Sequence, residues 1–117
     1  MIPHGVDVFV CLEPIDLRWS FDRLSNLALD RVGREARCGA LFVFFGRRQD
    51  ALKVLFFDGS GMCLFYKRLD RGRFRIPTSA DSRAVAITIE ERELDDLLDG
   101  IDLTASSKSR ARPRRTH

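Results

Sequence analysis

Residues 41–69 read LFVFFGRRQDALKVLFFDGSGMCLFYKRL, and this stretch decides the fold. Three runs rich in aromatic and β-branched residues are typical of strands, and the short segments between them carry the Gly, Asp and Gln of turns. In chain order the segments are LFVFF (41–45), GRRQD (46–50), LKVLFF (52–57), DGSG (58–61) and MCLFYKRL (62–69). The stretch therefore predicts two successive hairpins, a β-meander.

The chain before the meander predicts one strand and one helix. VDVFVCL (6–12) alternates and is rich in valine, which indicates a strand that Pro14 stops. Between Asp16 and Val32 apolar residues recur at threes and fours, as in an amphipathic helix. Ser20 or Asp16 is placed to cap its start and Gly33 to end it. The same spacing predicts that Phe21 points toward the core more than Trp19 does. For Trp19 a packed position is favoured over an exposed one that would contact a partner.

A polar loop follows the meander, and then a second pair of elements. AVAIT (84–88) predicts a short strand, and Thr88 with Glu91 fits a capping box at the start of a helix. Leu94, Leu97, Leu98 and Ile101 form the apolar face of that helix, and Gly100 stands where its C-terminal cap belongs. We expect an α+β domain over residues 1–103, with an antiparallel sheet of about four or five strands and two helices. Residues 104–117, TASSKSRARPRRTH, predict a disordered basic tail.

Composition narrows the classes of function. Neither a signal peptide nor an apolar run of membrane-spanning length is present, so we expect a cytoplasmic protein without a membrane partner. The three cysteines, Cys11, Cys38 and Cys63, are widely spaced, and the two histidines lie near the chain ends. This pattern predicts buried small side chains and no metal site. Nothing indicates a cofactor or a small-molecule substrate.

Charge is distributed unevenly along the chain. Residues 31–75 carry eleven basic and four acidic side chains, whereas residues 76–103 carry two basic and eight acidic ones. The tail adds five basic residues and no acidic ones. Such polarity favours an anionic partner at one face, and nucleic acid is the commonest such partner.

The candidate binding residues lie in the basic segment. KRLDRGRFRIP (67–77) has five cationic residues among eleven, beside apolar Leu69, Phe74 and Ile76. If residues 67–76 are extended, one face is shared by Lys67, Leu69, Arg71, Arg73 and Arg75, unless Gly72 breaks the alternation. Arginine at loops and strand edges suits phosphate geometry. We therefore predict a surface for nucleic acid or an acidic partner that comprises Arg47, Arg48, Lys53, Lys67, Arg68, Arg71, Arg73 and Arg75.

The same residues also admit other interpretations. A solvated basic sheet face needs no partner, and Phe65, Tyr66 and Phe74 either pack or stack on unpaired bases. Asp50 and Lys53 are one residue too far apart for the acid–lysine pair of restriction-type nucleases. DGSG lacks the residues of a phosphate-binding loop. No catalytic constellation is found, so we do not expect an enzyme.

These segments together resemble a known family, the small TnpB accessory proteins of IS sixty-six type bacterial insertion sequences, over residues 5–103. This family is distinct from the RNA-guided nucleases also called TnpB. The motif positions that match are Arg18, Phe21, Asp22, Leu24, Gly46, Arg47, Arg48, Asp50, Lys53, Asp58, Gly61, Lys67, Arg68, Leu69, Gly72, Arg73, Phe74 and Pro77. Departures from the pattern are Leu17 for methionine, Phe57 and Ile76 for tryptophans, and Asp70 for glutamate.

The resemblance implies a helper of transposition, encoded beside a separate transposase that carries out the strand chemistry, and it supplies no catalytic residues to carry over to this chain. We expect the transposase and DNA as partners. Two hypotheses follow: an accessory protein that binds the DNA backbone within the transposase complex, or an interaction module that binds the transposase with little DNA contact.

Overall fold

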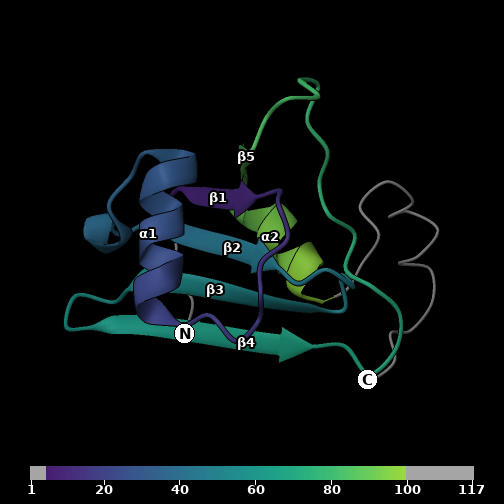
Figure 1. Cartoon of the computed structure of the whole chain (residues 1–117), viewed down its shortest axis with the longest axis horizontal. Coiled ribbons are helices and arrows are strands. Elements are labelled where there is room, and N and C mark those ends of the chain that lie inside the picture. The colour runs from purple at the N-terminus through teal and green to yellow at the C-terminus, as the bar shows by residue number, and fades with distance from the viewer. Residues whose placement is uncertain (1–4, 100–117) are drawn as a thin grey trace.

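The computed structural model describes residues 5–99. Five strands form one sheet in the order β4-β3-β2-β1-β5, and helices lie on both of its faces (Figure 1). The elements in chain order are β1 (Val8–Cys11), α1 (Phe21–Val32), the short 3-10 helix η1 (Ala36–Cys38), β2 (Leu41–Phe45), β3 (Ala51–Phe57), β4 (Met62–Arg68), β5 (Ala86–Ile89) and α2 (Glu91–Leu98). The predicted α+β class, with about four or five strands and two helices, is confirmed by the five strands and two α-helices within residues 5–99.

The meander is present, and one pairing elsewhere in the sheet differs from the expectation. β2 pairs with β3 and β3 with β4, both antiparallel, as the two turn segments predicted. β5 is also antiparallel to β1, but β1 and β2 are parallel. The chain between β1 and β2 passes through α1, and a helical crossover of this kind returns the chain in its original direction. The sheet is therefore mixed, not wholly antiparallel.

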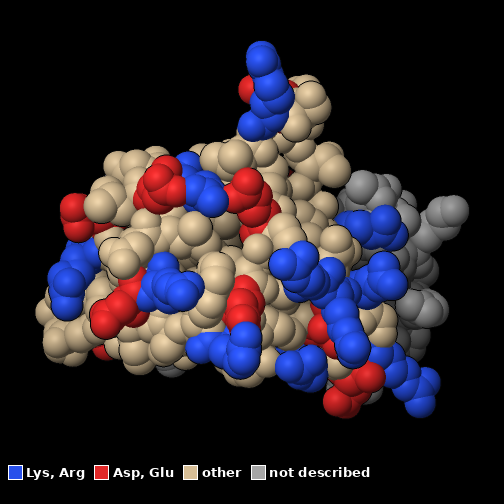
Figure 2. Space-filling model, viewed as in Figure 1, with Lys and Arg blue, Asp and Glu red and all other residues tan. Residues whose placement is uncertain are grey.

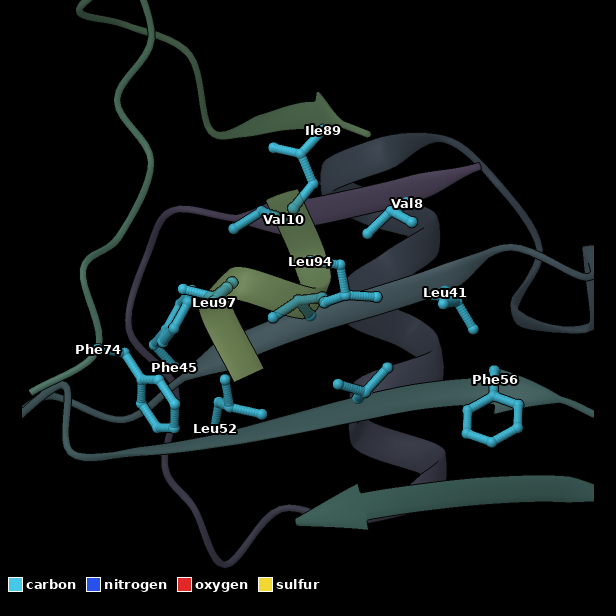
Figure 3. Packing of buried hydrophobic residues seen from close by; sticks show 12 residues of the cluster. Val8, Val10, Leu41, Phe45, Leu52, Phe56, Phe74, Ile89, Leu94 and Leu97 are labelled. Atoms are coloured by element: carbon cyan, nitrogen blue, oxygen red, sulfur yellow. The ribbon is translucent and has the colours of Figure 1, made fainter. Parts of the chain in front are cut away.

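Both faces of the central strands are buried, which explains their unbroken apolar sequence. Every residue of β2 is buried, and alternate side chains belong to two separate clusters. Leu41, Val43 and Phe45 face α2, whose Leu94 and Leu97 pack against the sheet (Figure 3). Phe42 and Phe44 face α1, with Leu24 and Ala28.

Helix α1 starts later than its periodicity predicted. It begins at Phe21 with Ser20 as N-cap, and it ends as expected at Gly33, whose φ of 80° is the left-handed conformation that glycine adopts readily. The preceding residues are not helical, because Asp16 accepts the backbone N–H of Arg18 and closes a local turn. The expected inward position of Phe21 is wrong: its side chain is 41 % exposed, while Trp19 is half-buried.

Helix α2 has a different cap from the predicted one. The capping box joins Glu90 and Glu93, not Thr88 and Glu91. Thr88 lies within β5, whose pairing with β1 continues through Ile89, so the N-cap, Glu90, lies two residues beyond the predicted one. The expected cap at Gly100 and the tail 104–117 fall outside the described residues.

Candidate anion-binding groove

The basic segments meet at one end of the sheet. There the turn between β2 and β3, the end of β4 and the loop after it, and the segment before α1 lie together. Figure 2 shows Lys and Arg side chains gathered toward this end, on the right of the view, where Figure 1 places the ends of β2 and β4.

Three backbone hydrogen bonds hold these segments in place. Ile15 N donates to Phe45 O at 2.8 Å, Leu69 N to Asp50 O at 2.8 Å, and Phe74 N to Gln49 O at 2.6 Å. They connect the β2–β3 turn to residues well before and well after it in the chain. The arrangement is therefore a property of the tertiary fold and not of one loop.

The end of the sheet is hollowed by two adjoining spaces, which we call together the basic groove. The first has a volume of about 490 Å³ and is lined by Pro14, Ile15, Asp16, Leu17, Trp19, Arg47, Arg48, Asp50 and Arg68. The second has a volume of about 480 Å³ and is lined by Arg47, Arg48, Gln49, Asp50, Gly72 and Arg73. Arg47, Arg48 and Asp50 border both.

Phe74 explains why arginine and apolar residues alternate after β4. Its side chain is 2 % exposed and its ring centroid lies 6.1 Å from that of Phe45 (Figure 3). Leu69 and Ile76 also pack against this core cluster. Arg71, Arg73 and Arg75 lie between these anchors and are exposed. The apolar residues attach the loop to the core, and the arginines face solvent.

The arginines of the groove differ in how they are paired. Arg68 lies 3.6 Å from the Asp50 carboxylate and donates to the Tyr66 hydroxyl at 2.8 Å. Within residues 5–99, Arg47, Arg48 and Arg73 have no ion pair or side-chain hydrogen bond. Their guanidinium groups are available to an anion, and binding one would break no ion pair or side-chain hydrogen bond within the described part of the chain.

The carboxylate of Asp16 forms an ion pair with Arg18, two residues further along the chain. Arg18 donates to both oxygens, with its Nη2 2.6 Å from Oδ2. These hydrogen bonds lower the pKa of Asp16 to about 2, so the group is ionised at neutral pH.

Lys53 occupies a place unlike that of the other predicted site residues. It is only 8 % exposed, and its Nζ donates to the carbonyl oxygen of Trp19 at 2.8 Å. The same Nζ lies 5.2 Å from the centre of the Tyr66 ring. Lys53 thus fixes the segment that enters α1 and does not line the groove.

The remaining predicted residues are divided between two regions. Lys67 points to the α2 face, where its Nζ donates to the carbonyl of Leu98. Arg71 and Arg75 are exposed in the loop after β4, outside the lining of the groove. The structure therefore brings Arg47, Arg48, Arg68 and Arg73 together. The condition for a shared face at 67–76 is not met, since β4 ends at Arg68 and Gly72, the residue named as a break in the alternation, has a φ of 76°.

Replacing Lys53 with methionine is expected to lower the free energy of unfolding by about 1–3 kcal/mol, because the Trp19 carbonyl loses its charged donor. Urea unfolding measures this change. Arg71→Met serves as the control and is expected to change stability by less than about 0.5 kcal/mol, as exposed substitutions usually do. Equal losses for the two variants would show that the Lys53 hydrogen bond does not stabilise the fold.

Sequence reasoning did not select two residues that shape the groove. Trp19 lines it because the turn at 16–19 replaces the expected helix. Gly46 allows Leu17 to approach, since a Cβ at position 46 would lie 2.6 Å from Leu17 Cδ1. The glycine of the GRR segment was the sequence feature that indicates this contact, because a side chain that approaches the backbone closely often requires a glycine there.

Metal binding, thiol chemistry and membrane insertion have little support among the residues described. Residues 5–99 hold no group of three or more His, Cys, Asp or Glu side chains that could bind a metal. Cys11 is buried, which raises the pKa of its thiol to about 12, but Cys38 is exposed at the end of η1, contrary to expectation. Among the described helices none has the length and apolarity needed to cross a bilayer.

The fold and the groove define a small α+β protein with an arginine-lined surface suited to an anionic partner. The chain belongs to the family described as IS66 Orf2 like protein, which matches residues 6–108. This match confirms the resemblance found in the sequence. The family is an accessory family of insertion-sequence transposition, and the chain is accordingly associated with a transposition system of this type.

Two relatives come from Sinorhizobium fredii (strain NBRC 101917 / NGR234). The uncharacterized protein y4hO is 43 % identical over 104 residues, which cover 87 % of this chain and 88 % of the relative. The uncharacterized protein y4jC is 33 % identical over 101 residues, which cover 86 % and 84 % respectively. No solved structure matches significantly.

Proposed function

We propose that this protein is a non-catalytic accessory protein of transposition that binds the DNA backbone through the basic groove, within a complex with its transposase. The observation that carries the proposal is the meeting of Arg47, Arg48 and Arg73 around one groove, without partners in residues 5–99. Planar guanidinium groups form paired hydrogen bonds with phosphate oxygens. A site made of such groups holds a backbone and reads little sequence.

The groove is also placed well for a long, rigid partner. It lies at the end of the sheet, between elements that are fixed by the core. The exposed residues Arg71 and Arg75 belong to the same loop as Gly72 and Arg73, which line the groove. These further cations extend the positive surface beyond the groove. A DNA backbone spans several phosphates and benefits from such an extended surface.

The alternative partner surface is the outer side of α2. Glu90, Asp95 and Asp99 are exposed there, and the helix carries no basic residue in its last turn. An acidic surface of this kind fits a basic patch on the transposase. It favours the second candidate function, a module that binds the transposase with little DNA contact.

Fluorescence anisotropy with a labelled duplex tests the proposal. One duplex carries the terminal repeat of the element and a second has the same composition in scrambled order. Saturable binding of both is expected, because backbone contacts do not depend on sequence. Co-purification with the transposase after nuclease treatment, combined with no duplex binding, would favour the α2 alternative and contradict the DNA proposal.

A further inference from the structure

The two halves of the basic groove differ in chemistry. The half between Arg73 and Arg48 is lined mainly by charged and polar groups. The other half has a wall of apolar side chains from the segment before α1, Pro14, Ile15, Leu17 and Trp19, which faces the arginines of the β2–β3 turn. Ile15, Leu17 and Trp19 also pack in the cluster beneath α1, and their remaining surface forms an apolar wall of the groove.

An unpaired nucleotide matches both halves. In a duplex the base faces are stacked inside the helix and only edges are offered in the grooves. In a single strand each base exposes a flat apolar face close to its own phosphate, and proteins bind such strands with aromatic platforms beside cationic grooves. A volume of about 490 Å³ lies in the range of pockets that hold small organic molecules.

Trp19 has the features of such a platform. Its backbone carbonyl is held by Lys53 Nζ at 2.8 Å, which fixes the position of the residue. The guanidinium carbon of Arg23 lies 4.7 Å from the centroid of its ring. A base would therefore pack on the part of the indole that lines the groove and is covered neither by Arg23 nor by the cluster beneath α1.

The charged residues are placed differently in the two halves. Arg47, Arg48 and Asp50 line both halves, whereas Asp16 and Arg68 line the apolar half only and Arg73 lines the other half only. In the apolar half two carboxylates offset part of the charge of the arginines, whereas Asp50 is the one carboxylate of residues 5–99 that lines the half with Arg73. A phosphate is therefore matched best at Arg47, Arg48 and Arg73, and the base of the same nucleotide at the apolar wall.

We propose that the basic groove binds single-stranded DNA, with one base against Trp19 and Leu17 and the adjoining phosphate at Arg47, Arg48 and Arg73. This inference rests on the proposed function and adds to it the strand state of the DNA. A single strand is then preferred over a duplex of the same length, because only the single strand fills the apolar half.

The intrinsic fluorescence of the protein provides a direct test, since Trp19 is the single tryptophan of the chain. The protein is titrated with an oligothymidylate and with an abasic strand of equal length, which keeps the phosphates and lacks the bases. We expect the oligothymidylate to change the tryptophan emission and to bind about tenfold or more tightly than the abasic strand, as the loss of one stacked base predicts.

A matched pair of leucine variants extends the test. Leu17→Ala removes part of the apolar wall and is expected to weaken binding of the oligothymidylate without weakening binding of a duplex. Leu29→Ala, at a position 47 % exposed on α1 and outside the groove lining, is expected to change neither. Circular dichroism confirms that both variants are folded.

Two results would overturn the inference, and they are distinguishable. Equal affinity for the two strands with unchanged tryptophan emission, together with salt-dependent duplex binding, would reject the base site and leave the backbone-binding proposal standing. Absence of binding to all three DNAs would reject the proposed function and this inference together.

Discussion

Phe74→Ala is expected to lower the free energy of unfolding by about 3–5 kcal/mol, the usual cost of removing a buried phenylalanine. Phe74 is 2 % exposed and packs with Phe45 in the cluster beneath α2. It is also the apolar anchor nearest to Arg73 and Arg75 in the chain, and its N–H donates to Gln49 O. The substitution should therefore reduce stability and loosen the loop that carries these arginines.

Urea or guanidinium unfolding measures the loss for Phe74→Ala, with Phe21→Ala as the matched control. Phe21 is the same residue type at 41 % exposure, so its truncation should cost less than about 1 kcal/mol. If Phe74→Ala unfolds at the same midpoint as Phe21→Ala, then the loop is not anchored as described.

The second large effect concerns binding. Replacing Arg47, Arg48 and Arg73 together with alanine is expected to weaken binding to DNA on the order of 100-fold at 0.1 M salt, because three phosphate contacts and their released counterions are lost. All three side chains are exposed and without partners among residues 5–99, so stability should change little.

A control triple variant separates local contacts from net charge. Arg37, Arg83 and Arg92 are exposed and lie in η1, in the loop before β5 and in α2, outside the groove lining. Their replacement by alanine removes the same charge and should reduce affinity only slightly. Equal weakening by the two triple variants would mean that overall charge, and not the groove, attracts the DNA.

The sequence was sufficient to predict the helices and strands that are determined by short-range residue patterns. The meander follows from apolar strands separated by turn residues, and Gly33 ends α1 as its position predicted. For the beginning of α1 the sequence left Ser20 and Asp16 open as caps, because the periodicity continues through Leu17. The contacts of Asp16 with Arg18 close a turn there, and Ser20 is the N-cap. Local hydrogen bonds of an aspartate compete with a helix, and apolar spacing does not report them.

The groove itself depends on contacts between distant parts of the chain. Pattern reasoning identified the arginines, but their grouping requires Ile15 beside Phe45 and Phe74 beside Gln49. Lys53 illustrates the same limit: its alternation on β3 places it on the α1 face, where Trp19 supplies an acceptor that no local pattern predicts. Parallel pairing of β1 and β2 likewise follows only once the crossover through α1 is known.

The central claim, that the groove binds the DNA backbone, is tested most directly by the salt dependence of duplex binding. Association constants for the wild-type protein are measured by anisotropy between about 50 and 200 mM salt, a range over which phosphate contacts change affinity strongly. With three to four phosphates at the arginines of the groove, the log–log slope should be about −3 or steeper, at −0.9 for each phosphate neutralised. A slope near zero, or no binding at the lowest salt, would contradict the account.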